Sequence, residues 1–220
     1  MTNLINFQKS VLHLQTMTTN EIKFKLKKYL PDFVFSTVYS VWFQIVKPAI
    51  ELYNKRILKS FKRETVGEII CDGINFKIKI NPSNGTLDRE IFLNNVYEPF
   101  FLKLIKKNLS ERSVFVDIGA NIGQHSLFAS KVVGNSGKVI SFEPIKKLYQ
   151  QFKESIELNS ISNITVHNLA CGNETKKMTI NISSLNIGAS SLVRSYSDGG
   201  SEQISIVTAD SILESELKID

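Results

Sequence analysis

An alternation of strand-like and helix-like segments from residue 114 onward is the feature that most constrains the fold. VFVDI (114–118) is typical of a buried strand, and GQHSLFASKVV (123–133) of a helix. A second strand, KVISFE (138–143), is followed by another helix and a third strand, ITVHNLA (164–170). This order predicts an α/β fold in which helices cover the faces of a parallel sheet. In such sheets the ligand lies beyond the carboxyl ends of the strands.

The turn after the first strand has the composition of a ligand-binding loop. Gly119 and Gly123 lack a Cβ, so the chain can turn sharply there and a ligand can approach the backbone. Asp117 ends the first strand, and Glu143 ends the second, where an acidic side chain can accept hydrogen bonds from both hydroxyls of a ribose. Together these residues predict a nucleoside-containing ligand, either a dinucleotide or S-adenosylmethionine.

Spacing favours S-adenosylmethionine. The loop reads D-x-G-x-x-x-G, with Asn121 where the dinucleotide fingerprint G-x-G-x-x-G would have its middle glycine. Asp117 would repel a pyrophosphate but attract a ligand that carries a protonated amine and a sulfonium. A dinucleotide-dependent oxidoreductase is therefore the disfavoured alternative.

Four stretches carry a resemblance to a known family. VFVDIGANIGQHSLFAS, GKVISFEP, NLACGN and LNIGASSL resemble, in this order, the FkbM family of S-adenosylmethionine-dependent methyltransferases. The resemblance covers roughly residues 87–220. It implies a Rossmann-like class I methyltransferase fold and O-methylation of a sugar or another small hydroxylated product.

The resemblance also implies a set of cofactor-binding residues. The first cofactor loop, the ribose-binding acid and the adenine pocket of the family match Asp117, Gly119, Asn121, Gly123, Glu143 and Ala170. No catalytic residue follows from it. His125 is interpreted as a helix-surface residue beside the cofactor. Glu98 either borders the site or supports the start of a helix, and the second interpretation is preferred.

The end of the sequence bears on how complete the sheet is. The family continues with a fourth strand close to IKIDVEG, whereas this sequence ends in ELKID. We therefore expect a sheet that is incomplete at the C-terminus and a chain that is a fragment of the full enzyme. The first strand, 114–118, would then have an open edge through which the protein could self-associate.

A hairpin and a further helix are predicted before the first strand. Asp72 and Gly73 form a favoured two-residue turn between two strand-like runs. In EPFFLKLIKKNLS (98–110), Pro99 stands where a first helical residue would be. Cys71 and Cys171 show no metal-ligand spacing, so no metal site is expected, and a reducing compartment is favoured.

Positive charge is concentrated in the N-terminal segment. The net charge is +6, but residues 1–63 carry eleven Lys and Arg against three acidic residues, a net of +8, which leaves −2 for the other 157 residues. The apolar run 33–46 is too short to cross a bilayer, which needs about 20 residues. We expect a basic, amphipathic helical arm (1–63) that packs on the rest of the protein or on a second copy.

A membrane surface is the alternative partner of residues 20–63. Nucleic acid is not expected, because nothing resembles a nucleic-acid-binding module. The expected domains are thus the arm, 1–63, and the methyltransferase domain, 64–220. The expected localisation is cytoplasmic, with peripheral contact at the inner face of the membrane left open. A non-catalytic membrane-surface or partner-binding protein with a vestigial Rossmann-like domain is the alternative function.

Overall fold

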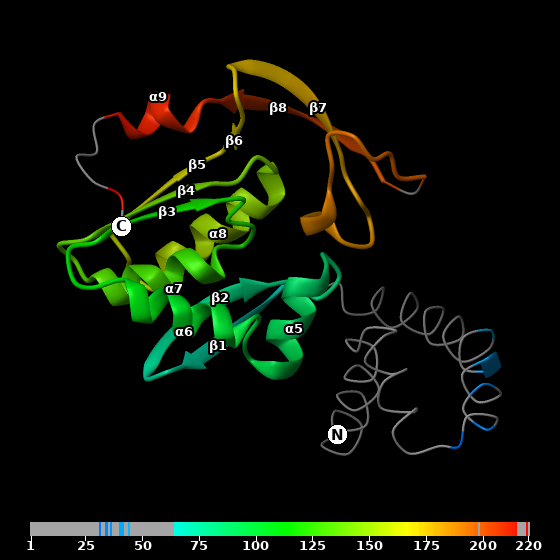
Figure 1. Ribbon diagram of the computed structural model, residues 1–220, viewed down its shortest axis with the longest axis horizontal. Coiled ribbons are helices and arrows are strands. Elements are labelled where there is room, and N and C mark those ends of the chain that lie inside the picture. Colours follow the sequence, from blue (N-terminus) through cyan, green and yellow to red (C-terminus); the bar gives the residue numbers. More distant parts are fainter. Residues whose placement is uncertain are drawn as a thin grey trace. The chain divides into compact units, whose positions relative to one another are not determined.

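The computed structural model describes residues 64–197, 199–214 and 219, and in addition positions 31, 34, 36, 40, 41 and 44. By internal packing the chain divides into two units, Met1–Lys62 and Arg63–Asp220. The predicted basic arm therefore lies outside the described residues, apart from those few positions. Among the described residues, no helix is both long and apolar enough to cross a membrane. The second unit contains the elements from β1 to α9 (Figure 1).

The second unit begins with the predicted hairpin. Strands β1 (Thr65–Cys71) and β2 (Ile74–Ile80) pair antiparallel, with Cys71 opposite Ile74. Both turn residues have positive φ, 51° at Asp72 and 79° at Gly73, as a tight two-residue hairpin turn requires. The prediction from the Asp-Gly pair is therefore confirmed.

Two helices lie between the hairpin and the first parallel strand. They are α5 (Thr86–Asn94) and α6 (Pro99–Asn108). Pro99 is the first residue of α6, as predicted, because its missing N–H would have no helical partner there anyway. Leu102 and Ile105 form the buried stripe of α6.

A three-stranded parallel sheet forms the centre of the unit. Its order is β3 (Val114–Ile118), β4 (Lys138–Phe142) and β5 (Ile164–His167). The connections are α7 (Gln124–Val133) and α8 (Lys146–Leu158), so the predicted strand–helix alternation is confirmed. Among the described strands, β3 pairs only with β4 and thus forms one end of this sheet.

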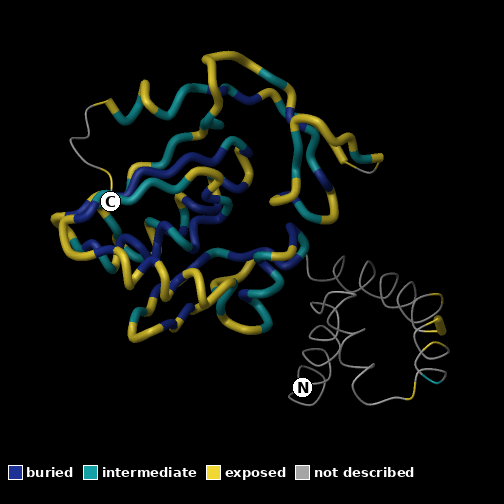
Figure 2. Tube along the Cα trace, in the orientation of Figure 1, coloured by how far each residue is buried: buried dark blue, intermediate teal, exposed yellow. Residues whose placement is uncertain are grey.

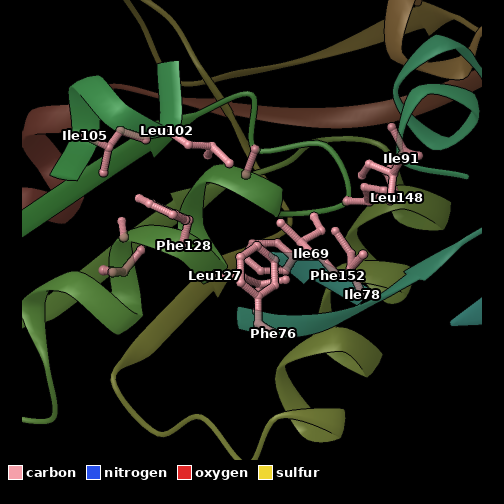
Figure 3. Close-up of a cluster of buried hydrophobic side chains, with 14 of the residues drawn as sticks. Ile69, Phe76, Ile78, Ile91, Leu102, Ile105, Leu127, Phe128, Leu148 and Phe152 are labelled. Carbon is pink, nitrogen blue, oxygen red and sulfur yellow. The ribbon is translucent and has the colours of Figure 1, made fainter. Parts of the chain in front are cut away.

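The elements pack in three layers. Helices α7 and α8 lie between the parallel sheet and strand β2 of the hairpin (Figure 1). Buried positions are concentrated in α7 and in β4, which is covered along four of its five residues (Figure 2). The apolar side chains between hairpin and helices form the core (Figure 3); they include Ile69, Phe76, Ile78, Leu127, Phe128, Leu148 and Phe152.

The predicted third strand is too long. The structure ends β5 at His167, and its last inter-strand bond runs from Glu143 N to His167 O, 3.0 Å. The side-chain amide of Asn168 then donates to the carbonyls of Glu143 and Pro144, each at 2.9 Å, so the chain leaves the sheet there. The expectation that the strand continues to Ala170 was wrong because a side chain, rather than the backbone, takes up these carbonyls.

Ala170 belongs to a second sheet that the sequence analysis did not predict. This sheet has the order β6 (Ala170–Cys171), β8 (Ser201–Val207) and β7 (Lys176–Asn181). Strands β6 and β8 are parallel, whereas β7 and β8 are antiparallel. The short helix η2 (Ile187–Ala189) lies in the connection between β7 and β8, and α9 (Ala209–Leu213) follows β8.

A buried polar network joins the segment after the hairpin to α8. Asp88, which is 2% exposed, accepts hydrogen bonds from Asn81 N at 2.6 Å and from Gln151 Nε2 at 2.8 Å. Asn84 donates to Gln151 Oε1 at 2.9 Å and accepts from Lys147 Nζ at 2.6 Å. Burial raises the pKa of Asp88 to about 6, although both hydrogen bonds oppose the shift.

This pKa makes the stability depend on pH. The pKa of Asp88 in the folded protein lies above its ordinary value of 3.8. The contribution of Asp88 to the free energy of unfolding is therefore fully present below pH 4 and is lost as the pH rises through 6. Asp88→Asn keeps an acceptor oxygen but cannot ionise. We expect urea unfolding to show the variant more stable than the parent at pH 7, by up to about 3 kcal/mol, with a smaller difference at pH 4. Parallel pH profiles for the two proteins would contradict this, and the exposed Asp210→Asn is the control.

Candidate functional site

The loop between β3 and α7 is held at the carboxyl ends of two neighbouring strands. The N–H groups of Gly119 and Ala120 both donate to Phe142 O, at 2.9 and 3.0 Å. Three loop residues have positive φ: 81° at Gly119, 54° at Asn121 and 83° at Gly123. Residues other than glycine rarely adopt this backbone conformation, so the two glycines of the loop favour its geometry.

The two glycines of the loop have different surroundings. A Cβ at Gly119 would have no atom within 4 Å, so the backbone there borders open space. A Cβ at Gly123 would lie 2.1 Å from the ring of Phe152 on α8. Gly123 therefore allows the loop to pack against the core, whereas Gly119 leaves room for a ligand to approach the backbone.

Glu143 joins the loop to the end of β4. Its carboxylate accepts hydrogen bonds from Asn121 N and from Ile145 N, each at 2.8 Å, and the residue is only 4% exposed. Burial raises the pKa of Glu143 to about 7; the two N–H groups oppose the shift, and the nearby acids Asp117 and Glu202 add to it. The ionisation of Glu143 is therefore poised near neutral pH.

Asp117, the last polar residue of β3, is tied to the helix that follows. Its Oδ2 accepts a hydrogen bond from Ser126 Oγ at 2.5 Å, and Ser126 Oγ lies 2.8 Å from Ser141 Oγ on β4. Burial raises the pKa of Asp117, and the Ser126 hydroxyl and His125 oppose the shift. The carboxylate is thus held beside the loop in a poorly solvated position.

His125 lies in the first turn of α7 and faces α6. Its side chain is 21% exposed, its Nε2 is 3.9 Å from Glu98 Oε2, and its ring centroid is 5.1 Å from that of Phe101. Burial lowers the pKa of His125, while Asp117 and Glu98 oppose the shift. The His125 side chain is therefore half-buried beside Glu98 and Phe101, whereas a helix-surface position was expected.

Gln124, which the sequence analysis did not single out, anchors the segment before α6. It is 1% exposed, its Oε1 accepts from Tyr97 N at 2.8 Å, and its Nε2 donates to Tyr97 O at 2.7 Å. A two-point amide contact of this kind fixes both position and orientation. Nothing local in the sequence indicates a contact between residues 27 positions apart.

Ala170, the remaining predicted residue, lies on a different strand from the other predicted site residues. Ala170 begins β6, two residues after Asn168, whose side chain donates to Glu143 O. On the other side of the loop, a Cβ at Gly188 in η2 would lie 2.5 Å from Asn121 Nδ2. The structure thus brings five predicted residues into one site, Asp117, Gly119, Asn121, Gly123 and Glu143, with Ala170 on an adjoining strand.

The site offers acceptors and open backbone rather than metal ligands. Within the described part of the chain, no group of three or more His, Cys, Asp and Glu side chains could hold a metal ion. The carboxylates of Asp117 and Glu143 suit donors such as hydroxyls or an ammonium group. The residues therefore match an organic ligand that carries such donors.

Several solved structures are similar to this chain. A methyltransferase dependent on S-adenosylmethionine from Aquifex aeolicus is 25% identical over 31% of this chain and 35% of its own, with a TM-score of 0.28. Trm5b from Pyrococcus abyssi is 17% identical over 51% of this chain and 33% of its own, with a TM-score of 0.36. TYW2 from P. horikoshii, in complex with MeSAdo, is 19% identical over 70% of this chain and 64% of its own, with a TM-score of 0.35.

These similarities are partial. The chain spans less than two thirds of the length of each of the three proteins, and the TM-scores are below 0.5. None of the curated proteins with which the chain was compared gives a match. The assignment therefore depends on a family model and on the parallel sheet itself.

The family model confirms the resemblance found in the sequence. The methyltransferase FkbM domain matches residues 117–220, a range that begins at the acid of the loop and includes Glu143 and Ala170. The Rossmann-like parallel sheet of β3, β4 and β5 agrees with it. Residues 117–220 of the chain are therefore similar to the methyltransferase FkbM domain.

Proposed function

We propose that this chain binds S-adenosylmethionine at the β3–α7 loop and directs its methyl group to a hydroxyl of a sugar or another small hydroxylated product. The family supports methyl transfer in general. The observation that carries the proposal is the hydrogen bond between Asn121 N and the Glu143 carboxylate, which unites the loop and the second acid in one site.

The open backbone at Gly119 fits a ligand of this kind. With a φ of 81° and no atom within 4 Å of a Cβ position, Gly119 presents its Cα to free space at the carboxyl end of β3. This is where ligands bind in open α/β sheets. A side chain at this position would both strain the backbone and fill that space.

Glu143 would hold the ribose. Each carboxylate oxygen already accepts one backbone N–H, and each can accept one more hydrogen bond. Because the residue is only 4% exposed, a small shift of the Asn121 backbone is needed to admit the ribose hydroxyls. Ala170, on the strand after Asn168, would border the adenine.

Asp117 would attract the positive end of the ligand. Its carboxylate is held by Ser126 beside the loop, in a place where burial strengthens charge interactions. When bound, the cofactor supplies a methyl group activated by a sulfonium. The residues described here would contribute by alignment of that methyl with the acceptor oxygen, which is a large part of catalysis in reactions with a good leaving group.

Calorimetric titration of S-adenosylhomocysteine into the purified chain, with NAD as the comparison ligand, tests this proposal. We expect saturable binding of S-adenosylhomocysteine only, and at least tenfold weaker binding in Glu143→Ala, because the ribose loses a charged acceptor. The matched control is Glu157→Ala, at an exposed glutamate of α8. Absence of binding to the folded chain, or equal affinity for NAD, would contradict the proposal.

The pH dependence of adenosine binding gives a second prediction. The pKa of Glu143 is about 7 in the free protein, and hydrogen bonds from ribose hydroxyls favour the ionised form, so binding releases a proton. Affinity is then lost as the pH falls below 7. We expect 5′-methylthioadenosine, which has no group that titrates in this range, to bind about tenfold more weakly at pH 6 than at pH 8.

Glu143→Gln is the control for this pH profile, because glutamine cannot ionise. Its affinity should be constant between pH 6 and 8. A profile that is flat for the parent protein, or that has the same slope in the variant, would show that Glu143 does not hold the ribose.

A further inference from the structure

The turn before α6 is fastened to the cofactor loop. Gln124, the residue directly after Gly123, holds both backbone groups of Tyr97 from a fully buried position. Glu98, next to Tyr97, therefore has a fixed place relative to the loop although it is 19 residues before Asp117 in the sequence.

Glu98 has an unusual backbone for its type. Its φ of 48° and ψ of 57° lie in the left-handed region, which is uncommon for residues other than glycine. Its carbonyl accepts the Phe101 N–H at the start of α6, but its side chain makes no capping hydrogen bond. The preferred sequence interpretation, support of the helix start, thus applies to the backbone. Burial and a hydrogen bond to the Glu98 carboxylate raise the pKa of Tyr97, and a carboxylate with one such partner can still accept further hydrogen bonds.

The carboxylate of Glu98 points to the imidazole of His125. Glu98 Oε2 is 3.9 Å from His125 Nε2, and Nε2 is a buried atom with no hydrogen-bond partner among the described residues. Asp117 acts on the same imidazole, as its electrostatic effect on His125 shows. The ring of Phe101, tilted at 52° to the imidazole, restricts how His125 can turn.

One carboxylate therefore lies 3.9 Å from the buried Nε2, and a second acts electrostatically on the same ring. None of the ion pairs in the described part of the chain joins Glu98 or Asp117 to a lysine or arginine. Burial keeps His125 neutral near pH 7, because it lowers the pKa of the imidazole. Among the described residues the arrangement lacks a cation, and an ammonium group, with three N–H donors, would supply both the charge and the hydrogen bonds.

We infer that Glu98 is a cofactor-binding residue, which, together with Asp117 and His125 Nε2, receives the ammonium group at the amino-acid end of S-adenosylmethionine. This inference rests on the proposed function, in which the loop and Glu143 hold the adenosine part. Glu98 would then distinguish the complete cofactor from ligands that have only the adenosine part.

Three ligands separate the two parts of the cofactor. S-adenosylhomocysteine has both the ammonium and the carboxylate, its decarboxylated amine keeps only the ammonium, and 5′-methylthioadenosine has neither. In calorimetric titrations we expect Glu98→Gln to bind the first two about tenfold more weakly than the parent protein does, because a charged hydrogen bond is lost. Binding of 5′-methylthioadenosine should be unchanged. Glu157→Gln, at an exposed glutamate, should bind all three as the parent does.

The other possible results contradict the inference. If Glu98→Gln binds all three ligands like the parent, Glu98 does not contact the ammonium. If it binds 5′-methylthioadenosine as weakly as S-adenosylhomocysteine, its role is to maintain the structure of the site. Either result leaves the proposed function intact as long as the parent binds 5′-methylthioadenosine. If the parent binds none of the ligands, the proposed function fails and this inference fails with it.

Discussion

The hydrogen bond from Asn121 N to the carboxylate of Glu143 is the interaction on which the site depends. It connects Asn121, the residue of the β3–α7 loop with a φ of 54°, to the end of β4. The same bond, with its partner from Ile145 N, keeps an acid buried at 4% exposure, where burial brings its pKa to about 7. The hydrogen bonds of the Glu143 carboxylate thus fix the loop geometry and the buried position of the acid.

Packing against the hydrophobic core fixes the position of the β3–α7 loop. Gly123 lies so close to Phe152 that no side chain fits between them, which seats the loop on α8. Phe152 is fully buried in the cluster between the hairpin and the helices (Figure 3). On the opposite flank, Gln124 fixes the backbone of Tyr97 and thereby the start of α6. The packing of the loop on α8 and the contacts of Gln124 with the segment before α6 therefore position the loop at the carboxyl ends of β3 and β4.

Local patterns in the sequence were enough for the hairpin, for α6 and for the strand–helix alternation, because turn chemistry and periodicity act over a few residues. They also indicated which residues would gather at the loop. The end of β5 could not be predicted, since it depends on where the Asn168 side chain finds acceptors. The same holds for the contact between Gln124 and Tyr97 and for the burial of Glu143, which arise only when distant segments pack.

Amide hydrogen exchange measured by NMR at Asn121 and Ile145 tests the central claim most directly. If the Glu143 carboxylate accepts from both groups, both amides exchange slowly in the native protein, and S-adenosylhomocysteine slows exchange in the loop further. In Glu143→Gln, only one side-chain oxygen remains as an acceptor, so at least one of the two amides must exchange faster. An Asn121 amide that exchanges at the rate of an unprotected chain in the native protein would contradict the account.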